Sequence, residues 1–132
     1  MYVAAAKWTE QFRFNCTGNA GFTVPVDGDS KTANSPTDLV LMALCGCTAY
    51  DVVSILQKKR EPFTAVEVSA EAEKATQSPR VYAEIKLLYK IRGKVSHKAV
   101  EDAVRLSEEK YCSVSIMLSK TAKISYRIEL DS

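Results

Sequence analysis

The chain has 132 residues, of which 46% are hydrophobic and 26% are charged, and its formal net charge is +2. This length predicts one domain over residues 1–132, and the composition excludes disordered, collagen-like and low-complexity chains. The basic residues are scattered, so no nucleic-acid partner and no membrane surface is expected.

The N-terminal third has the pattern of short strands. Phe12, Phe14 and Cys16 alternate with polar residues, which is typical of a strand that is buried on one face. A glycine-containing turn leads into a second strand over residues 22–26. Pro25 predicts an edge position for that strand, because proline has no backbone N–H to donate to a neighbouring strand.

A strong helix signal follows, over residues 36 to about 60. Ser35 is a good N-cap, Pro36 suits the first helical position, and Asp38 completes a capping box. Every residue of Leu39–Cys47 is apolar or small, which predicts a helix that is buried on all sides. One sheet and one other helix could hardly cover it, so we expect an intertwined homodimer.

No membrane span and no targeting segment is expected. The longest uncharged apolar run, residues 39–50, is shorter than the ~18 residues that a spanning helix needs. The first eight residues lack the layout of a signal peptide. We therefore expect a cytoplasmic protein, whose cysteines are thiols rather than a disulfide framework. They are Cys16, Cys45, Cys47 and Cys112.

The remaining elements are a hairpin, two helices and a strand. Apolar and polar residues alternate over residues 66–72 and 81–91, which predicts a β-hairpin. A helix with a serine N-cap is predicted over residues 96–110, a short helical turn after Cys112, and a last strand over residues 124–130. This order of elements predicts an α+β fold rather than alternating parallel βαβ units.

The two cysteines of the long helix point to nearly opposite sides of it, because successive residues are rotated by about 100°. Cys47 lies on a polar stripe with Asp51, whereas Cys45 lies on the apolar side with Val52 and Leu56. Apolar burial opposes thiolate formation, so Cys47 is predicted to be the reactive thiol. A charged Asp51 would oppose a thiolate at Cys47, and an arginine from elsewhere would have to offset it.

Other interpretations of the cysteines stay open. Cys112 lies near the start of a helical turn, where the positive helix end favours a thiolate. Alternatively, all four cysteines are small buried residues without reactivity, which is the usual role of a free cysteine. Zinc is disfavoured because Cys45 and Cys47, two apart on one helix, cannot both reach one metal. No metal and no cofactor is therefore expected.

Two cysteine motifs resemble those of the OsmC/Ohr family. The segment SPTDLVLMALCGCTA at residues 35–49 is similar to the signature of the family's central helix, and KYCSVS at residues 110–115 to its second cysteine motif. The order of elements is also similar, and the residues from Cys47 to Leu56 resemble the family's YhfA-like branch. The resemblance implies an OsmC-like α+β fold, with antiparallel sheets around a long buried central helix in an intertwined dimer.

The resemblance also implies an activity: a cysteine-based thiol peroxidase that reduces small organic hydroperoxides in defence against oxidative stress. Cys47 matches the peroxidatic cysteine and Cys112 the resolving one, and a dithiol reductant, of lipoyl type in the Ohr branch, restores both. Thr37 stands where the family's peroxidases carry a glutamate that holds an arginine beside the thiolate. Asp38 is the neighbouring acid, and Arg13 is the nearest candidate for that arginine.

A non-enzymatic function is the alternative. A dimer with the same fold could sense oxidation or bind a small apolar ligand beside Cys47. Rapid loss of thiols with a hydroperoxide would separate a redox protein from an inert one. Repeated turnover with a dithiol would separate an enzyme from a sensor.

Overall fold

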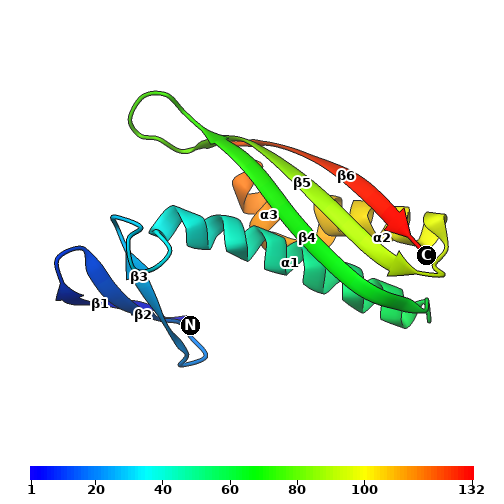
Figure 1. The fold of residues 1–132 in the computed structure, drawn as a ribbon, viewed down its shortest axis with the longest axis horizontal. Coiled ribbons are helices and arrows are strands. Elements are labelled where there is room, and N and C mark those ends of the chain that lie inside the picture. The colour runs from blue at the N-terminus through cyan, green and yellow to red at the C-terminus, as the bar shows by residue number, and fades with distance from the viewer. The chain divides into compact units, whose positions relative to one another are not determined.

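The computed structural model describes residues 1–132, which divide into two compact units, Met1–Met42 and Ala43–Ser132. The architecture is α+β, as predicted (Figure 1). In chain order the elements are β1 (Ala5–Glu10), β2 (Arg13–Thr17), β3 (Thr23–Asp27), α1 (Pro36–Lys58), β4 (Phe63–Lys74), β5 (Tyr82–Gly93), α2 (His97–Leu106), η1 (Ser107–Tyr111), α3 (Ser113–Leu118) and β6 (Lys123–Asp131).

The first unit contains an antiparallel sheet in the order β1-β2-β3. β3 pairs only with β2, which confirms the edge position predicted from Pro25. β1 was not predicted, because all six of its residues are exposed and it has no buried face to produce an apolar alternation.

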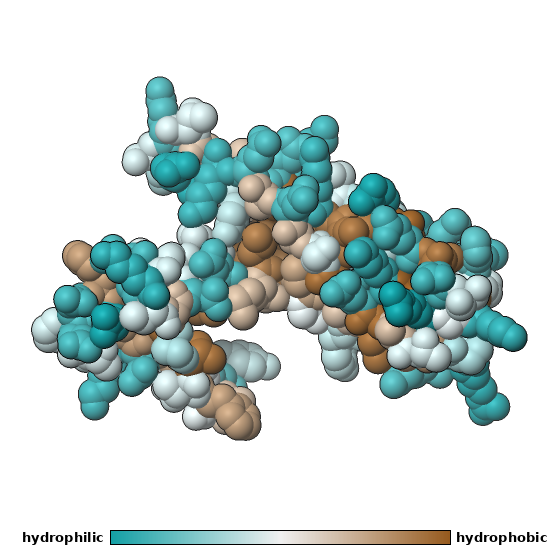
Figure 2. All heavy atoms as spheres, viewed as in Figure 1, coloured by the Kyte–Doolittle hydropathy of each residue, from teal (hydrophilic) through white to brown (hydrophobic).

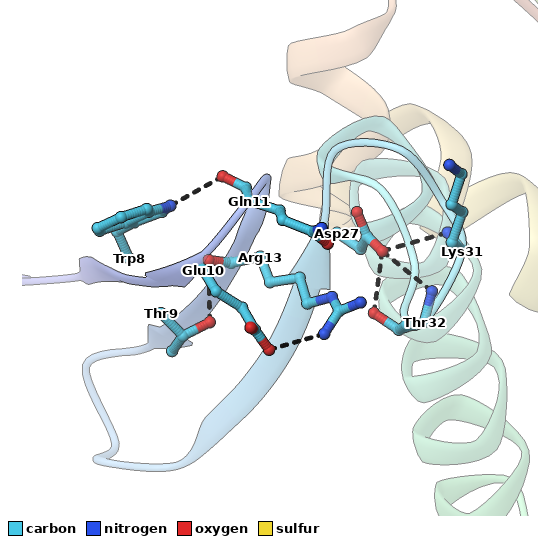
Figure 3. Close-up of polar contacts among 8 residues, drawn as sticks. All are labelled: Trp8, Thr9, Glu10, Gln11, Arg13, Asp27, Lys31 and Thr32. Atoms are coloured by element: carbon cyan, nitrogen blue, oxygen red, sulfur yellow. Dashed lines mark hydrogen bonds and ion pairs between the residues drawn. The ribbon is translucent and has the colours of Figure 1, made fainter.

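A tight turn follows β3 and is organised by one carboxylate, that of Asp27 (Figure 3). It accepts backbone hydrogen bonds from Asp29 (2.8 Å), Thr32 (3.0 Å) and Lys31 (3.2 Å), and the Thr32 hydroxyl donates at 2.9 Å. These bonds, that from Asp29 first, lower the pKa of Asp27 because they favour its charged form. The turn leads directly to the start of α1.

α1 begins with the predicted capping box. The Ser35 backbone N–H donates to Asp38 Oδ2 at 3.0 Å, and the Asp38 N–H donates to Ser35 Oγ at 3.2 Å. The helix ends at Lys58, within the predicted limits. Its fully buried residues recur at every fourth position and form one stripe: Leu44, Thr48, Val52 and Leu56.

The all-round burial predicted for α1 is not reached within a single chain. Met42 is 53% exposed and Tyr50 is 72% exposed. A chain of this size has only enough sheet and helix to cover one stripe of α1. Other large apolar side chains also reach the surface, and hydrophobic side chains are visible among hydrophilic ones in Figure 2.

By length and composition alone, α1 could cross a membrane, and it is the one helix of the chain that could. The core helix of a soluble protein passes the same test. Because its buried stripe packs in the protein interior, α1 is a core helix and not a membrane span.

The second unit contains a sheet in the order β4-β5-β6. The predicted hairpin of β4 and β5 is antiparallel, with Val68 opposite Tyr89. β6 is parallel to β5, which corrects the expectation of wholly antiparallel sheets. The reason is that the chain crosses back through three helical segments before β6, and such a crossover returns the next strand in the same direction.

The helices of this unit lie on one side of the sheet (Figure 1). The side chains of β5 that face them are fully or almost fully buried: Ile85, Leu87, Tyr89 and Ile91. They form the core together with the stripe of α1 and the apolar face of α2. β5 ends at Gly93, whose φ of +121° suits only glycine; a Cβ there would lie 2.6 Å from the Pro62 carbonyl oxygen.

The predicted helix over residues 96–110 is not uniform. Its N-cap is confirmed, since Ser96 Oγ accepts from the Ala99 N–H at 3.2 Å. However, α2 ends at Leu106 and continues as the π-helical turn η1, in which the Cys112 N–H donates to the Ser107 carbonyl at 2.8 Å. A π-turn inserts an extra residue into the helical register and often marks a functional site. It changes which side chains face the core.

Candidate redox site

A partly buried cluster of side chains joins the long helix to the segment between η1 and α3. The two sulfurs of Cys47 and Cys112 and a carboxylate oxygen of Asp51 all lie within 4.8 Å of one another. Cys47 and Asp51 are one turn apart on α1, so their side chains lie on the same face. Cys47 is half-buried and Cys112 is completely buried. The structure thus brings together two cysteines that are distant in sequence.

Cys112 is the N-cap residue of α3. Its Sγ accepts a hydrogen bond from the Ser115 N–H at 3.3 Å. Burial raises the pKa of the Cys112 thiol, and so does its hydrogen bond with Cys47, while the Ser115 N–H acts in the opposite direction. The expected position at a helix start is confirmed, but burial and not the helix end dominates at Cys112.

Asp51 is held by a hydrogen bond from η1. Ser107 Oγ donates to Asp51 Oδ2 at 2.9 Å, and Ser107 is completely buried. None of the ion pairs formed within residues 43–132 includes Asp51. Within this unit the carboxylate therefore has no positively charged partner.

A second polar network is centred on Glu108, which belongs to η1, the element that precedes Cys112. The Tyr89 hydroxyl donates to Glu108 Oε1, and Ser115 Oγ donates to Glu108 Oε2 at 2.9 Å. Tyr89 is completely buried. Burial raises the pKa of its hydroxyl, and the adjacent Glu108 raises it further. The network connects β5, η1 and α3, so it fixes the segment that carries Cys112.

These supporting residues were not recognised from the sequence, although two of them leave a signal. Tyr89 follows the inward alternation of its strand, and a buried tyrosine hydroxyl requires a hydrogen-bond partner. Ser107 shares the apolar face of its helix with Val100 and Val104, which is an unusual place for a serine. No pattern identifies Glu108, because its contacts with Tyr89 and Ser115 join three different elements.

The other candidate residues, Arg13 and Asp38, belong to the first unit, residues 1–42. The Arg13 guanidinium forms an ion pair with Glu10 at 2.8 Å, as Figure 3 shows, and Asp38 caps α1. Cys45 is not part of the cluster, and burial raises the pKa of its thiol. This agrees with the assignment of Cys45 to the apolar side and Cys47 to the polar side of α1.

We expect Glu108→Ala to lower the free energy of unfolding by about 1–3 kcal/mol, because the buried hydroxyls of Tyr89 and Ser115 lose their acceptor. Urea denaturation would measure this. The exposed neighbour Glu109 offers a matched control, and Glu109→Ala should change the value by less than about 0.5 kcal/mol. Equal effects of the two variants would contradict the role assigned to Glu108.

The chain is similar to known proteins in sequence and in structure. The model of a family described as OsmC-like protein matches residues 27–127. The chain is 41% identical to Protein YhfA of Escherichia coli K12 over 129 residues, with 96% of each chain covered. It is similar to the crystal structure of a hypothetical protein from Aquifex aeolicus VF5, with 28% identity, a TM-score of 0.86 and coverage of 100% and 98%.

A more distant structure is that of an organic hydroperoxide resistance protein OsmC from Legionella pneumophila. It is 13% identical, with a TM-score of 0.73 and coverage of 98% of this chain and 96% of that one. At this identity the likeness shows a shared fold.

Proposed function

Since this chain belongs to the OsmC-like family, we propose that it is a cysteine-based thiol peroxidase that reduces organic hydroperoxides. The observation that carries the proposal is the proximity of the Cys47 and Cys112 sulfurs in a partly buried cluster. Some distant structural relatives are named as organic hydroperoxide resistance proteins, which supports the same substrate class.

The first step is assigned to Cys47. Its thiolate attacks one oxygen of the hydroperoxide ROOH, and the O–O bond breaks as the new S–O bond forms. The departing alkoxide takes a proton and leaves as the alcohol ROH, so the peroxide is reduced by two electrons. Cys47 is left as a sulfenic acid. Its half-buried position gives a small peroxide access that the fully buried Cys112 lacks.

The second step is assigned to Cys112. Its thiolate attacks the Cys47 sulfur, and the hydroxyl group takes a proton and leaves as water. For this bond the sulfurs must approach from at most 4.8 Å to ~2.05 Å, which a small shift of the segment between η1 and α3 would achieve. A dithiol, of lipoyl type by family likeness, then reduces the disulfide and is itself oxidised to a disulfide.

A free-thiol count tests the proposal. Reduced protein should lose two thiols rapidly when it receives one equivalent of an organic hydroperoxide. Addition of a dithiol should restore both thiols and allow repeated turnover. If no thiol is lost over minutes, the peroxidase proposal fails.

A redox sensor is the second candidate. It is favoured by Thr37 at the place of the family's glutamate, and by the negative Asp51 beside Cys47. Both features withhold electrostatic support from the Cys47 thiolate and slow its reaction. Loss of two thiols without repeated turnover with any dithiol would identify the sensor.

A homodimer in the cytoplasm is part of the same proposal. The apolar side chains of α1 that remain exposed, such as Met42 and Tyr50, would be covered by a second copy of the chain. Size-exclusion chromatography with light scattering should then give twice the mass of one chain. A stable monomer would contradict the dimer and leave the cysteine chemistry to be judged separately.

A further inference from the structure

We propose that the reduced cluster of Cys47, Asp51 and Cys112 binds one divalent metal ion of the zinc type. This inference goes beyond the peroxidase proposal and does not depend on it. Cys45 and Cys47 cannot share a metal ion, because they point apart on α1. The tertiary structure instead pairs Cys47 with Cys112, 65 positions along the chain, and adds a carboxylate.

The donor set and its dimensions fit such an ion. Two thiolates and one carboxylate oxygen are ligands that Zn²⁺ prefers, and catalytic zinc sites often have three protein ligands and one open position. In a tetrahedral site with Zn–S bonds of ~2.3 Å, two sulfurs lie about 3.8 Å apart. The donor atoms here lie within 4.8 Å of one another, so adjustments of about 1 Å would close the site.

The surrounding hydrogen bonds also suit a metal site. The Ser107 hydroxyl binds Asp51 Oδ2 and leaves the other carboxylate oxygen available as a ligand. The Ser115 N–H donates to Cys112 Sγ, an interaction that orients a coordinating sulfur. Metal ligands are commonly oriented by such outer partners. Both partners are almost completely buried, so they are held firmly.

Binding of the ion would release the thiol protons of Cys47 and Cys112. The two thiolates and the Asp51 carboxylate would then carry three negative charges, which are stable in a partly buried place only when a cation is paired with them. No lysine, arginine or histidine of residues 43–132 forms an ion pair with Asp51. A divalent ion would supply the missing positive charge.

Metal binding and disulfide formation would exclude each other, because they use the same two sulfurs. When Cys47 and Cys112 form a disulfide, neither sulfur remains a thiolate ligand. A bound Zn²⁺ would conversely protect both thiols from hydroperoxide. The cluster would then hold zinc when reduced and release it when oxidised.

Titration of the reduced, metal-free full-length protein with Co²⁺ under anaerobic conditions tests this inference. We expect one Co²⁺ per chain, a thiolate-to-cobalt charge-transfer absorption, and displacement by one equivalent of Zn²⁺. Cys47→Ser and Cys112→Ser should each lower the intensity of the charge-transfer absorption by at least about half. Asp51→Asn should keep the absorption and weaken the affinity at least ~10-fold.

The matched control is Cys45→Ser, which makes the same substitution two residues away on the same helix and should leave both the stoichiometry and the affinity unchanged. Absence of the absorption in the unsubstituted protein would overturn the inference. Equal losses in the Cys45 and Cys47 variants would also overturn it, because the metal would then be bound elsewhere.

The two proposals can fail separately. Co²⁺ and Zn²⁺ binding is measured without peroxide, and thiol loss is measured on metal-free protein. A protein that binds Zn²⁺ but keeps its thiols in hydroperoxide supports the metal site and refutes the peroxidase. A protein that loses two thiols but binds no metal supports the peroxidase and refutes the metal site.

Discussion

Cys47→Ser should abolish the reaction with organic hydroperoxides. The rate of thiol loss should fall by at least about 10³-fold, to the background of the remaining thiols, because a serine hydroxyl is almost never ionised near neutral pH. Cys112 cannot replace Cys47, since it is completely buried and burial raises the pKa of its thiol. Stopped-flow mixing with a hydroperoxide, followed by a free-thiol assay, would measure the rate.

Cys45→Ser is the control for this experiment, because it changes the same atom on the opposite side of α1. It should leave the reaction rate unchanged and lower the free energy of unfolding by about 1 kcal/mol, since a hydroxyl replaces a sulfur in a half-buried apolar place. Equal loss of rate in the two variants would mean that Cys47 is not the specific nucleophile.

Cys112→Ser should trap the sulfenic acid intermediate of the proposed reaction. With one equivalent of hydroperoxide, this variant should lose one thiol instead of two, and Cys47 should remain as a sulfenic acid. The sulfenic acid would be labelled by a dimedone-type reagent and located by mass spectrometry. Turnover with a dithiol should fall sharply, because no Cys47–Cys112 disulfide forms.

The fold should tolerate Cys112→Ser. Cys112 is the N-cap of α3 and accepts from the Ser115 N–H, and serine is among the preferred residues for that role. An unfolding free energy close to that of the original protein would therefore accompany the chemical change. Loss of two thiols in this variant would show that another cysteine resolves the sulfenic acid, and the role of Cys112 would be refuted.

Local patterns were enough to predict most elements. The capping box at Ser35 and Asp38, the edge strand with Pro25 and the hairpin of β4 and β5 were all confirmed. Each depends on interactions between residues that are near one another in sequence or on a simple alternation. β1 was not predicted, because all its residues are exposed and its sequence has no apolar periodicity.

The helical wheel predicted different surroundings for the two cysteines of α1, and only Cys47 belongs to the cluster. Cys45 lies on the apolar side, where burial raises the pKa of its thiol, and Cys47 lies next to Asp51. That distinction required only the rotation of about 100° per residue. The helical wheel gives no information about which residues of other elements lie next to Cys47.

The sequence by itself therefore determined the α+β class, both ends of α1, the N-cap of α2 and the face of α1 that Cys47 shares with Asp51. Only the tertiary structure decided that Cys112 meets Cys47 and Asp51, that β6 runs parallel to β5, and that Ser107 binds Asp51 while Glu108 binds Tyr89 and Ser115. The reason is physical: caps and alternation arise from neighbours within a few residues, whereas the site joins segments whose distance is set by how the helices pack on the sheet.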